Sequence, residues 1–178
     1  PKFVPNFDKF NKVIRHKSGM YTFPPQIAIL LDYYGVKAKV FSSDNIKRSD
    51  EYPDQFKRWF GKDYQHEMKF IDLESFDWMV SETRKKRLFE VKRTKFEDLI
   101  SFFRQGFLVC LPIDWNTLVK KRGPYKGHFV ILSGTEKDNV LIHDPDAGPF
   151  LSYPIKQLKK AWQHPVIAED YFVAFGRK

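Results

Sequence analysis

The chain has 178 residues, of which 17% are aromatic, including 18 phenylalanines. This length suits one compact domain with a substantial core, and so many aromatic residues exclude an intrinsically disordered chain. No apolar run is long enough for a membrane-spanning helix and no segment has the pattern of a signal peptide, while the single cysteine, Cys110, excludes an intramolecular disulfide.

The formal net charge of +9 includes two dense basic runs, at residues 84–87 and 92–93. Such runs are typical of a surface that binds nucleic acid, an anionic membrane or an acidic partner. Alternatively, they are solvated cations at the end of a helix, where the helix dipole favours positive charge. Apart from the nearby Phe89, no aromatic residues accompany the runs as a stacking platform for bases would require, so we favour the solvated helix end.

The first strong helix signal follows Thr22, a candidate N-cap. Pro24 and Pro25 suit the first turn, where a missing N–H group has no cost, and the apolar run IAILLDYY continues to Gly35. Gly35 stands where a left-handed residue ends a helix. The segment 36–41, VKAKVF, alternates apolar and basic residues and predicts a half-buried strand.

Further helices are expected at residues 53–60 and 74–88. A stronger signal begins at Thr94, because Glu97 follows three residues later as in a capping box. Apolar residues then recur at helical spacing as far as Gly106.

The second half of the chain is rich in short apolar runs bounded by glycine and Asp-Pro signals. These runs predict strands at residues 107–113, 128–134, 139–144 and 171–175, with a helix at 154–162. Helices in the first half and antiparallel strands in the second indicate an α+β fold. We expect one domain over residues 1–178, with the helical N-terminal half packed on a C-terminal antiparallel sheet.

The runs HFVILSG and NVLIHD predict a β-hairpin because the polar segment TEKD separates them. A three-residue loop that pairs Gly134 with Asp138 would bury alternate aliphatic residues and place His128 directly opposite Asp144. A slip of one residue also leaves apolar residues on the buried face, so the pattern suggests this register without fixing it.

A carboxylate beside an imidazole fixes its tautomer and stabilises the imidazolium, as a base that activates a nucleophile requires. Alternatively, His128 closes one strand and Asp144 begins a turn. His143, Asp144 and Asp146 have ligand atoms for a metal, but their spacing matches no strong metal-binding pattern. We therefore expect no metal and no cofactor.

Residues 127–132, the hairpin and the Asp144–Pro145 pair resemble C39-like peptidases, which belong to the papain-like cysteine peptidase superfamily. In that family one strand opens with the catalytic histidine and a second ends in Asp-Pro, at the spacing seen here. The resemblance spans about residues 18–175 and is most specific around the hairpin. Residues 125–129 also match the Tyr-x-Gly-His-Phe element of a eukaryotic family named for guanylyl cyclase.

The resemblance implies a papain-like, C39-like fold in which His128 is the general base and Asp144 its orienting partner. It also implies a peptide or protein substrate, attacked by a cysteine thiolate. The loop 114–127 would border the cleft, and Trp115 and Tyr125 are the candidate substrate contacts, although each residue could equally cover the core.

The family's nucleophile is a cysteine at the start of its first helix, with a glutamine a few residues before it. Here Cys110 lies inside a predicted strand, where a small buried hydrophobe is expected. Either the segment 19–41 matches a later helix and the cysteine helix lies upstream of Pro1, or Thr22 occupies the nucleophile position. We favour the first alternative because strand 36–41 follows at once, and a threonine does not readily replace a thiolate.

Three functions are compatible with the sequence. The leading one is a cysteine-peptidase-related domain that is catalytically incomplete in this chain. The second is a non-catalytic module of the same fold that holds a peptide or protein partner, and the third is a basic nucleic-acid-binding domain.

Overall fold

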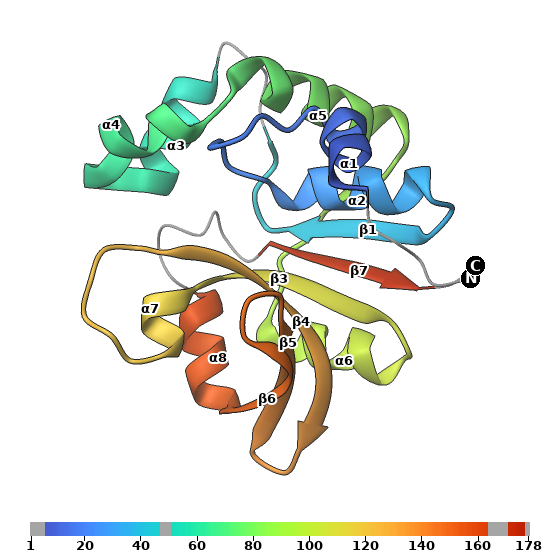
Figure 1. Ribbon diagram of the computed structural model, residues 1–178, viewed down its shortest axis with the longest axis vertical. Helices are drawn as coiled ribbons and strands as arrows, with labels where there is room; N and C mark the ends of the chain where they lie inside the picture. The colour runs from blue at the N-terminus through green and yellow to red at the C-terminus, as the bar shows by residue number, and fades with distance from the viewer. Residues whose placement is uncertain (1–5, 47–50, 164–170, 177–178) are drawn as a thin grey trace.

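A computed structural model describes residues 6–46, 51–163 and 171–176 (Figure 1). Its helices and strands, in chain order, are α1 (Phe7–Ile14), α2 (Pro24–Tyr33), β1 (Lys37–Ser42), α3 (Tyr52–Phe60), α4 (Tyr64–Glu67), α5 (Leu73–Lys85), β2 (Phe89–Val91), α6 (Phe96–Arg104), β3 (Leu108–Asp114), α7 (Trp115–Leu118), β4 (Gly127–Glu136), β5 (Asn139–Asp144), β6 (Gly148–Pro154), α8 (Ile155–Trp162) and β7 (Phe172–Gly176). None of the described helices has both the length and the apolar character needed to cross a bilayer.

Seven strands form one sheet in the order β2-β1-β7-β3-β4-β5-β6. Every pairing in it is antiparallel except that of β1 with β2. The predicted α+β class is confirmed, as are the predicted strands. The two edge strands, β2 and β6, were not predicted from the sequence, and neither was helix α7 inside the expected loop.

Both faces of the sheet are covered. Val40 and Phe56 belong to a first core against helices α2, α3 and α5, whereas Phe41 and Trp162 belong to a second core against α6 and α8. Consecutive strand residues serve opposite cores because side chains alternate across a strand. Figure 1 shows α1–α5 on one side of the sheet and α6–α8 on the other. The N-terminal helices thus pack on the sheet as expected, and C-terminal helices cover its other face.

The start of α2 is fixed by Gln26 rather than by the expected cap at Thr22. Phe23 is the N-cap residue, and its backbone N–H donates to Gln26 Oε1 over 2.8 Å. Gln26 Nε2 in turn donates to the carbonyl oxygen of Ile14 at 2.9 Å, which joins the end of α1 to the start of α2. At the other end, Gly35 has the predicted left-handed conformation, with φ +72°.

The predicted capping box of α6 is displaced by one residue. The helix begins at Phe96, and the Asp98 carboxylate accepts from the Lys95 N–H over 2.8 Å. Glu97 instead forms an ion pair with Lys159 of α8 at 2.9 Å. Two acidic residues stand in this first turn, and the one that faces the N-cap backbone accepts its hydrogen bond.

The predicted hairpin register is wrong by two residues at Leu132 and by three residues next to the turn. Leu132 pairs with Ile142, and Glu136 pairs with Asn139 across a two-residue turn that has Lys137 at φ 48°. An irregularity between Leu132 and Gly134 absorbs the residue that the longer predicted loop would have used. Up to Leu132 the shift is two residues, and because the pleat repeats every two residues these side chains keep their predicted face.

Replacing Gln26 by alanine tests how α2 is anchored. The variant leaves the Phe23 N–H and the Ile14 carbonyl without their buried partner, so we expect a loss of about 2–3 kcal/mol in unfolding free energy. Gln105→Ala removes an exposed contact with Ser101 and should cost less than about 0.5 kcal/mol. Urea denaturation followed by circular dichroism measures both. Equal stability of the two variants would contradict the anchoring role.

Candidate functional site

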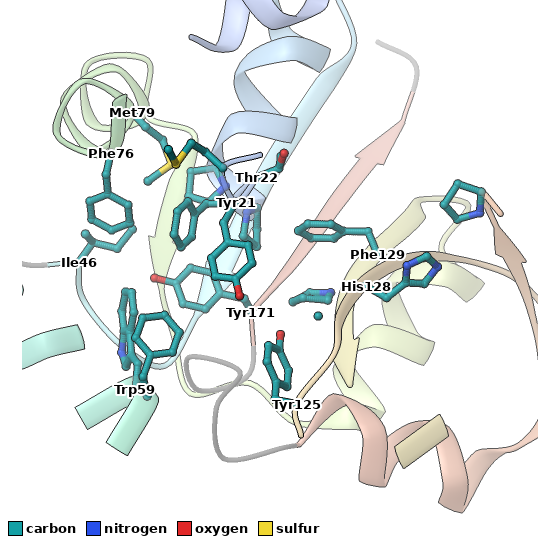
Figure 2. A pocket seen from close by; sticks show the side chains of 18 residues that line it. Tyr21, Thr22, Ile46, Trp59, Phe76, Met79, Tyr125, His128, Phe129 and Tyr171 are labelled. Atoms are coloured by element: carbon teal, nitrogen blue, oxygen red, sulfur yellow. The ribbon is translucent and has the colours of Figure 1, made fainter. Parts of the chain in front are cut away.

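A cavity of about 370 Å³ lies between the N-terminal helices and the start of β4 (Figure 2). Eight of its lining residues are aromatic, and none is Asp, Glu, Lys or Arg. Pockets of this size accept small organic groups or bulky side chains. The lining residues are Met20, Tyr21, Thr22, Phe23, Pro24, Pro25, Ile46, Trp59, Phe60, Phe76, Met79, Pro112, Tyr125, Gly127, His128, Phe129, Pro145 and Tyr171.

The pocket walls come from segments far apart in the sequence. The loop before α2 and the first turn of α2 form one wall. The C-terminal end of α3 provides Trp59, and the first turn of α5 provides Phe76. The first residues of β4, with Phe129, form the opposite wall. Figure 2 shows Trp59 and Ile46 at one side of the pocket and His128 at the other.

His128 and Asp144 are in direct contact, as predicted from the hairpin and the family spacing. Nε2 of His128 lies 2.9 Å from Oδ2 of Asp144. The Asp144 side chain is fully buried, and that of His128 is 16% exposed. His128 lies two residues before Val130 in β4, and Asp144 lies two residues after Ile142 in β5. Both side chains therefore point to the same face of the sheet, although the strands are offset by two residues from the predicted register.

The Asp144 carboxylate is held ionised. Burial, the largest influence, favours the neutral form, but backbone N–H groups of Ala147 and Asp146 and the adjacent His128 outweigh it and lower the pKa of Asp144. The two N–H groups donate to Oδ1 at 2.9 and 2.7 Å respectively.

An ionised carboxylate only accepts hydrogen bonds, so the proton of the contact sits on His128 Nε2. In the neutral imidazole Nδ1 then carries the lone pair, and Nδ1 forms no hydrogen bond within the part of the chain that the structure describes. The pair can therefore accept a proton, or a hydrogen bond from a ligand, at Nδ1.

The two predicted substrate contacts lie in different places. Tyr125 lines the pocket, and burial raises the pKa of its hydroxyl, which therefore stays protonated. Trp115 begins α7 and does not line the pocket; its ring meets the His128 ring edge-on, with centroids 5.0 Å apart and an interplanar angle of 61°. Trp115 thus packs beside the imidazole, whereas Tyr125 is accessible to a ligand in the pocket.

The loop that carries Tyr125 is closed at its base by the buried Asp114. Its carboxylate accepts from the backbone N–H groups of Asn116, Thr117 and Lys126 at 3.2, 3.1 and 2.9 Å. These bonds cap α7 and hold the two ends of the loop together. The position of Tyr125 is consequently set by β3 and β4.

Tyr21 is a site residue that the sequence did not indicate. Its hydroxyl donates to Oε2 of the buried Glu67 over 2.5 Å, and burial together with this carboxylate raises the pKa of Tyr21. The oxygen of Tyr21 can still accept a hydrogen bond in the pocket, because a phenol oxygen has acceptor capacity beyond its own donated bond.

Cys110 is unsuited to nucleophilic catalysis. It pairs with Ile131 of β4 and Val173 of β7 in the middle of the sheet, and burial raises the pKa of its thiol to about 12. A thiol with this pKa forms almost no thiolate at neutral pH.

The start of α2 lines the same pocket as His128, which is the arrangement expected if Thr22 stands at the nucleophile position. The Thr22 hydroxyl lies 3.4 Å from Nδ1 of His16, at the long limit of a hydrogen bond. Pro24 and Pro25 have no N–H group, and that of Phe23 is bound to Gln26. These three residues therefore offer no free donor for an oxyanion.

The candidate metal ligands are regrouped by the fold. His143 is exposed, and the ligand atoms that lie within 4.8 Å of one another belong to His128, Asp144 and Asp146. Both oxygens of Asp144 already accept hydrogen bonds, one of them from His128. A metal would have to separate that pair, so the group is poorly suited to hold one.

Replacing Asp144 by asparagine tests its ionisation. A folded-state pKa below the unfolded value of about 3.9 stabilises the fold above that pH, and the stabilisation is lost as the pH falls through the folded pKa. The difference in unfolding free energy between wild type and Asp144→Asn should therefore be constant above about pH 5 and shrink below about pH 4. Thermal and urea unfolding at several pH values measure it. A difference unchanged down to pH 3 would contradict the assignment.

No family model matches the chain, and no curated protein is significantly similar to it. Among solved structures, the chain is similar to a crystal structure described as a "putative C39-like peptidase" from Bacillus anthracis. The two share 12% sequence identity and a TM-score of 0.48 over 99% of this chain and 82% of the other. At this level of similarity no residue role passes from that protein to this one.

Proposed function

We propose that this chain is a peptide-binding domain of C39-like fold that keeps the His128–Asp144 pair without cysteine-dependent hydrolysis. The observation that carries the proposal is an uncharged, aromatic pocket that ends at His128, in a chain whose single cysteine is buried in β3. The family resemblance of residues 127–145 supports a peptide as the ligand.

The lining favours a bulky apolar side chain. Benzene fills a cavity of about 150 Å³, so a pocket of about 370 Å³ has room for more than one aromatic ring. Nδ1 of His128 and the hydroxyl of Tyr21 are available at the pocket for the main chain of a peptide. Two adjacent apolar residues of a peptide would thus match the pocket in size and polarity.

The same groups argue against amide hydrolysis by this chain. His128 and Asp144 can handle a proton, but acyl transfer also needs a nucleophile and donors for the oxyanion. The Cys110 thiol stays protonated because burial raises its pKa. The Thr22 hydroxyl lies beside His16 and not beside His128 in the hydrogen bonds of the described residues. The pair therefore serves here to orient a bound peptide.

Nucleic-acid binding has weaker support. Within the basic run 84–87, Arg84 donates to the Ile46 carbonyl, and Lys86 forms ion pairs with Asp32 at 2.7 Å and Glu82 at 3.8 Å. Half of that run is therefore engaged within the fold, which leaves fewer of its cations for phosphate groups.

A labelled peptide with Phe-Phe between neutral residues tests the proposal by fluorescence anisotropy, with a Gly-Gly peptide as its control. We expect the Phe-Phe peptide to bind at least about tenfold more tightly, and Phe129→Ala in the pocket wall to remove about that factor. Phe150→Ala is the matched control, since Phe150 is 65% exposed and does not line the pocket.

Mass spectrometry of the same mixtures tests the absence of hydrolysis. The peptide should remain intact over the incubation. Cleavage that disappears in His128→Ala would contradict a binding role, as would equal affinity for the Phe-Phe and Gly-Gly peptides.

A further inference from the structure

We infer that the loop between α7 and β4, residues 119–126, selects peptides that carry acidic residues next to the apolar anchor. This inference rests on the proposed peptide-binding function and adds a charge requirement to it. It concerns a surface outside the pocket lining, since no lining residue is Asp, Glu, Lys or Arg.

The loop concentrates positive charge. Lys120, Lys121, Arg122 and Lys126 are all exposed, and none of them forms an ion pair within residues 6–46, 51–163 and 171–176. The sequence contains no acidic residue between Asp114 and Glu136. These four cations, called the loop cations below, are thus free to pair with a ligand.

The loop presents its cations from a defined backbone. Asn116 Nδ2 donates to the Pro124 carbonyl at 2.8 Å, and the Asn116 carbonyl accepts from the Lys121 N–H at 2.9 Å. A Cβ on Gly123 would lie 2.9 Å from Asn116 Nδ2, so a larger residue there would displace the Asn116 side chain that holds Pro124. A preformed loop reduces the ordering entropy that binding would otherwise cost.

The loop that carries the cations adjoins the pocket. Lys126 stands between Tyr125 and Gly127, which both line it. Figure 1 shows the loop projecting beyond the sheet at the same side of the molecule as α3 and α4. We expect a peptide that leaves the pocket past Tyr125 to pass over this loop.

The surroundings of His128 disfavour an acidic ligand. Asp146 is exposed, and its carboxylate belongs to the group of ligand atoms within 4.8 Å beside His128 and Asp144. Acidic residues placed over His128 would meet this like charge. The expected orientation has the apolar pair in the pocket, the acidic residues over the loop cations and uncharged main chain near His128.

The experiment compares three labelled peptides that differ only after Phe-Phe: Glu-Glu, Ser-Ser and Lys-Lys. Stopped-flow fluorescence gives association and dissociation rates in about 20 mM and about 500 mM NaCl. We expect Glu-Glu to bind at least about tenfold more tightly than Lys-Lys at low salt, mostly through faster association, and the ratio to fall to about twofold at high salt.

Two variants of equal charge locate the effect. The first replaces the loop cations by glutamine, and the second replaces Lys85, Arg87, Lys92 and Arg93, which are exposed beside β2. The first variant should lose the preference for Glu-Glu while retaining the affinity for Ser-Ser, and the second should keep the preference. Loss of the preference in both variants would indicate net charge alone and overturn the inference.

The remaining outcomes separate this inference from the proposed function. Binding of all three peptides with equal affinity would overturn the inference and leave the pocket function standing. Equal affinity for Gly-Gly-Glu-Glu and Phe-Phe-Glu-Glu would show that the apolar residues do not contribute to binding, and this would overturn both proposals. A single-stranded DNA oligomer that binds through the loop cations more tightly than the Glu-Glu peptide would make nucleic acid the partner and overturn the acidic-peptide assignment.

Discussion

The buried carboxylate of Asp144 is the constraint on which the site depends. Its Oδ1 closes the turn from β5 to β6 by accepting from the N–H groups of Asp146 and Ala147, and its Oδ2 holds His128. A buried ionised group is tolerated only when donors surround it, so this turn and the imidazole orientation stabilise each other. The same contact leaves Nδ1 of His128 as the group available to a ligand. One carboxylate thus links the end of the sheet to the chemistry of the pocket.

The hairpin shows how a wrong register can lead to a correct contact. The sequence places His128 opposite Asp144 through a three-residue loop, whereas the structure has a two-residue turn and an irregularity before Gly134. The side chains still meet because the observed shift is an even number of residues and keeps their faces. Apolar residues point to both sides of β4 and β5, so each possible pairing of the two strands would bury apolar side chains. Packing against the two cores therefore selects the register. The local pattern predicted the main helices correctly. The predicted N-caps at Thr22 and Thr94 were wrong because the side chains of Gln26 and Asp98 accept the hydrogen bonds of the N-cap backbone instead.

The pocket itself had no signal in the sequence. Tyr21, Trp59, Phe76 and Phe129 come from separate elements and meet only when the N-terminal helices pack against the sheet. Periodicity reports which side of an element is buried and does not report where two buried surfaces leave a gap. The family resemblance drew attention to His128 and Asp144, which the structure brings into contact, and the catalytic roles that it implies for them stay predictions. An apolar pocket beside the buried His128–Asp144 pair is the arrangement that the proposed peptide-binding function requires.

The most direct test of this account is nuclear magnetic resonance of the tryptophan indole N–H groups during titration with the Phe-Phe peptide. Trp59 lines the pocket, whereas Trp162 is fully buried in the second core, where its Nε1 donates to the Tyr171 carbonyl. Assignment follows from Trp59→Phe and Trp162→Phe. The account predicts a saturable shift of the Trp59 signal with that of Trp162 unchanged. Peptide binding that leaves the Trp59 signal in place would contradict it.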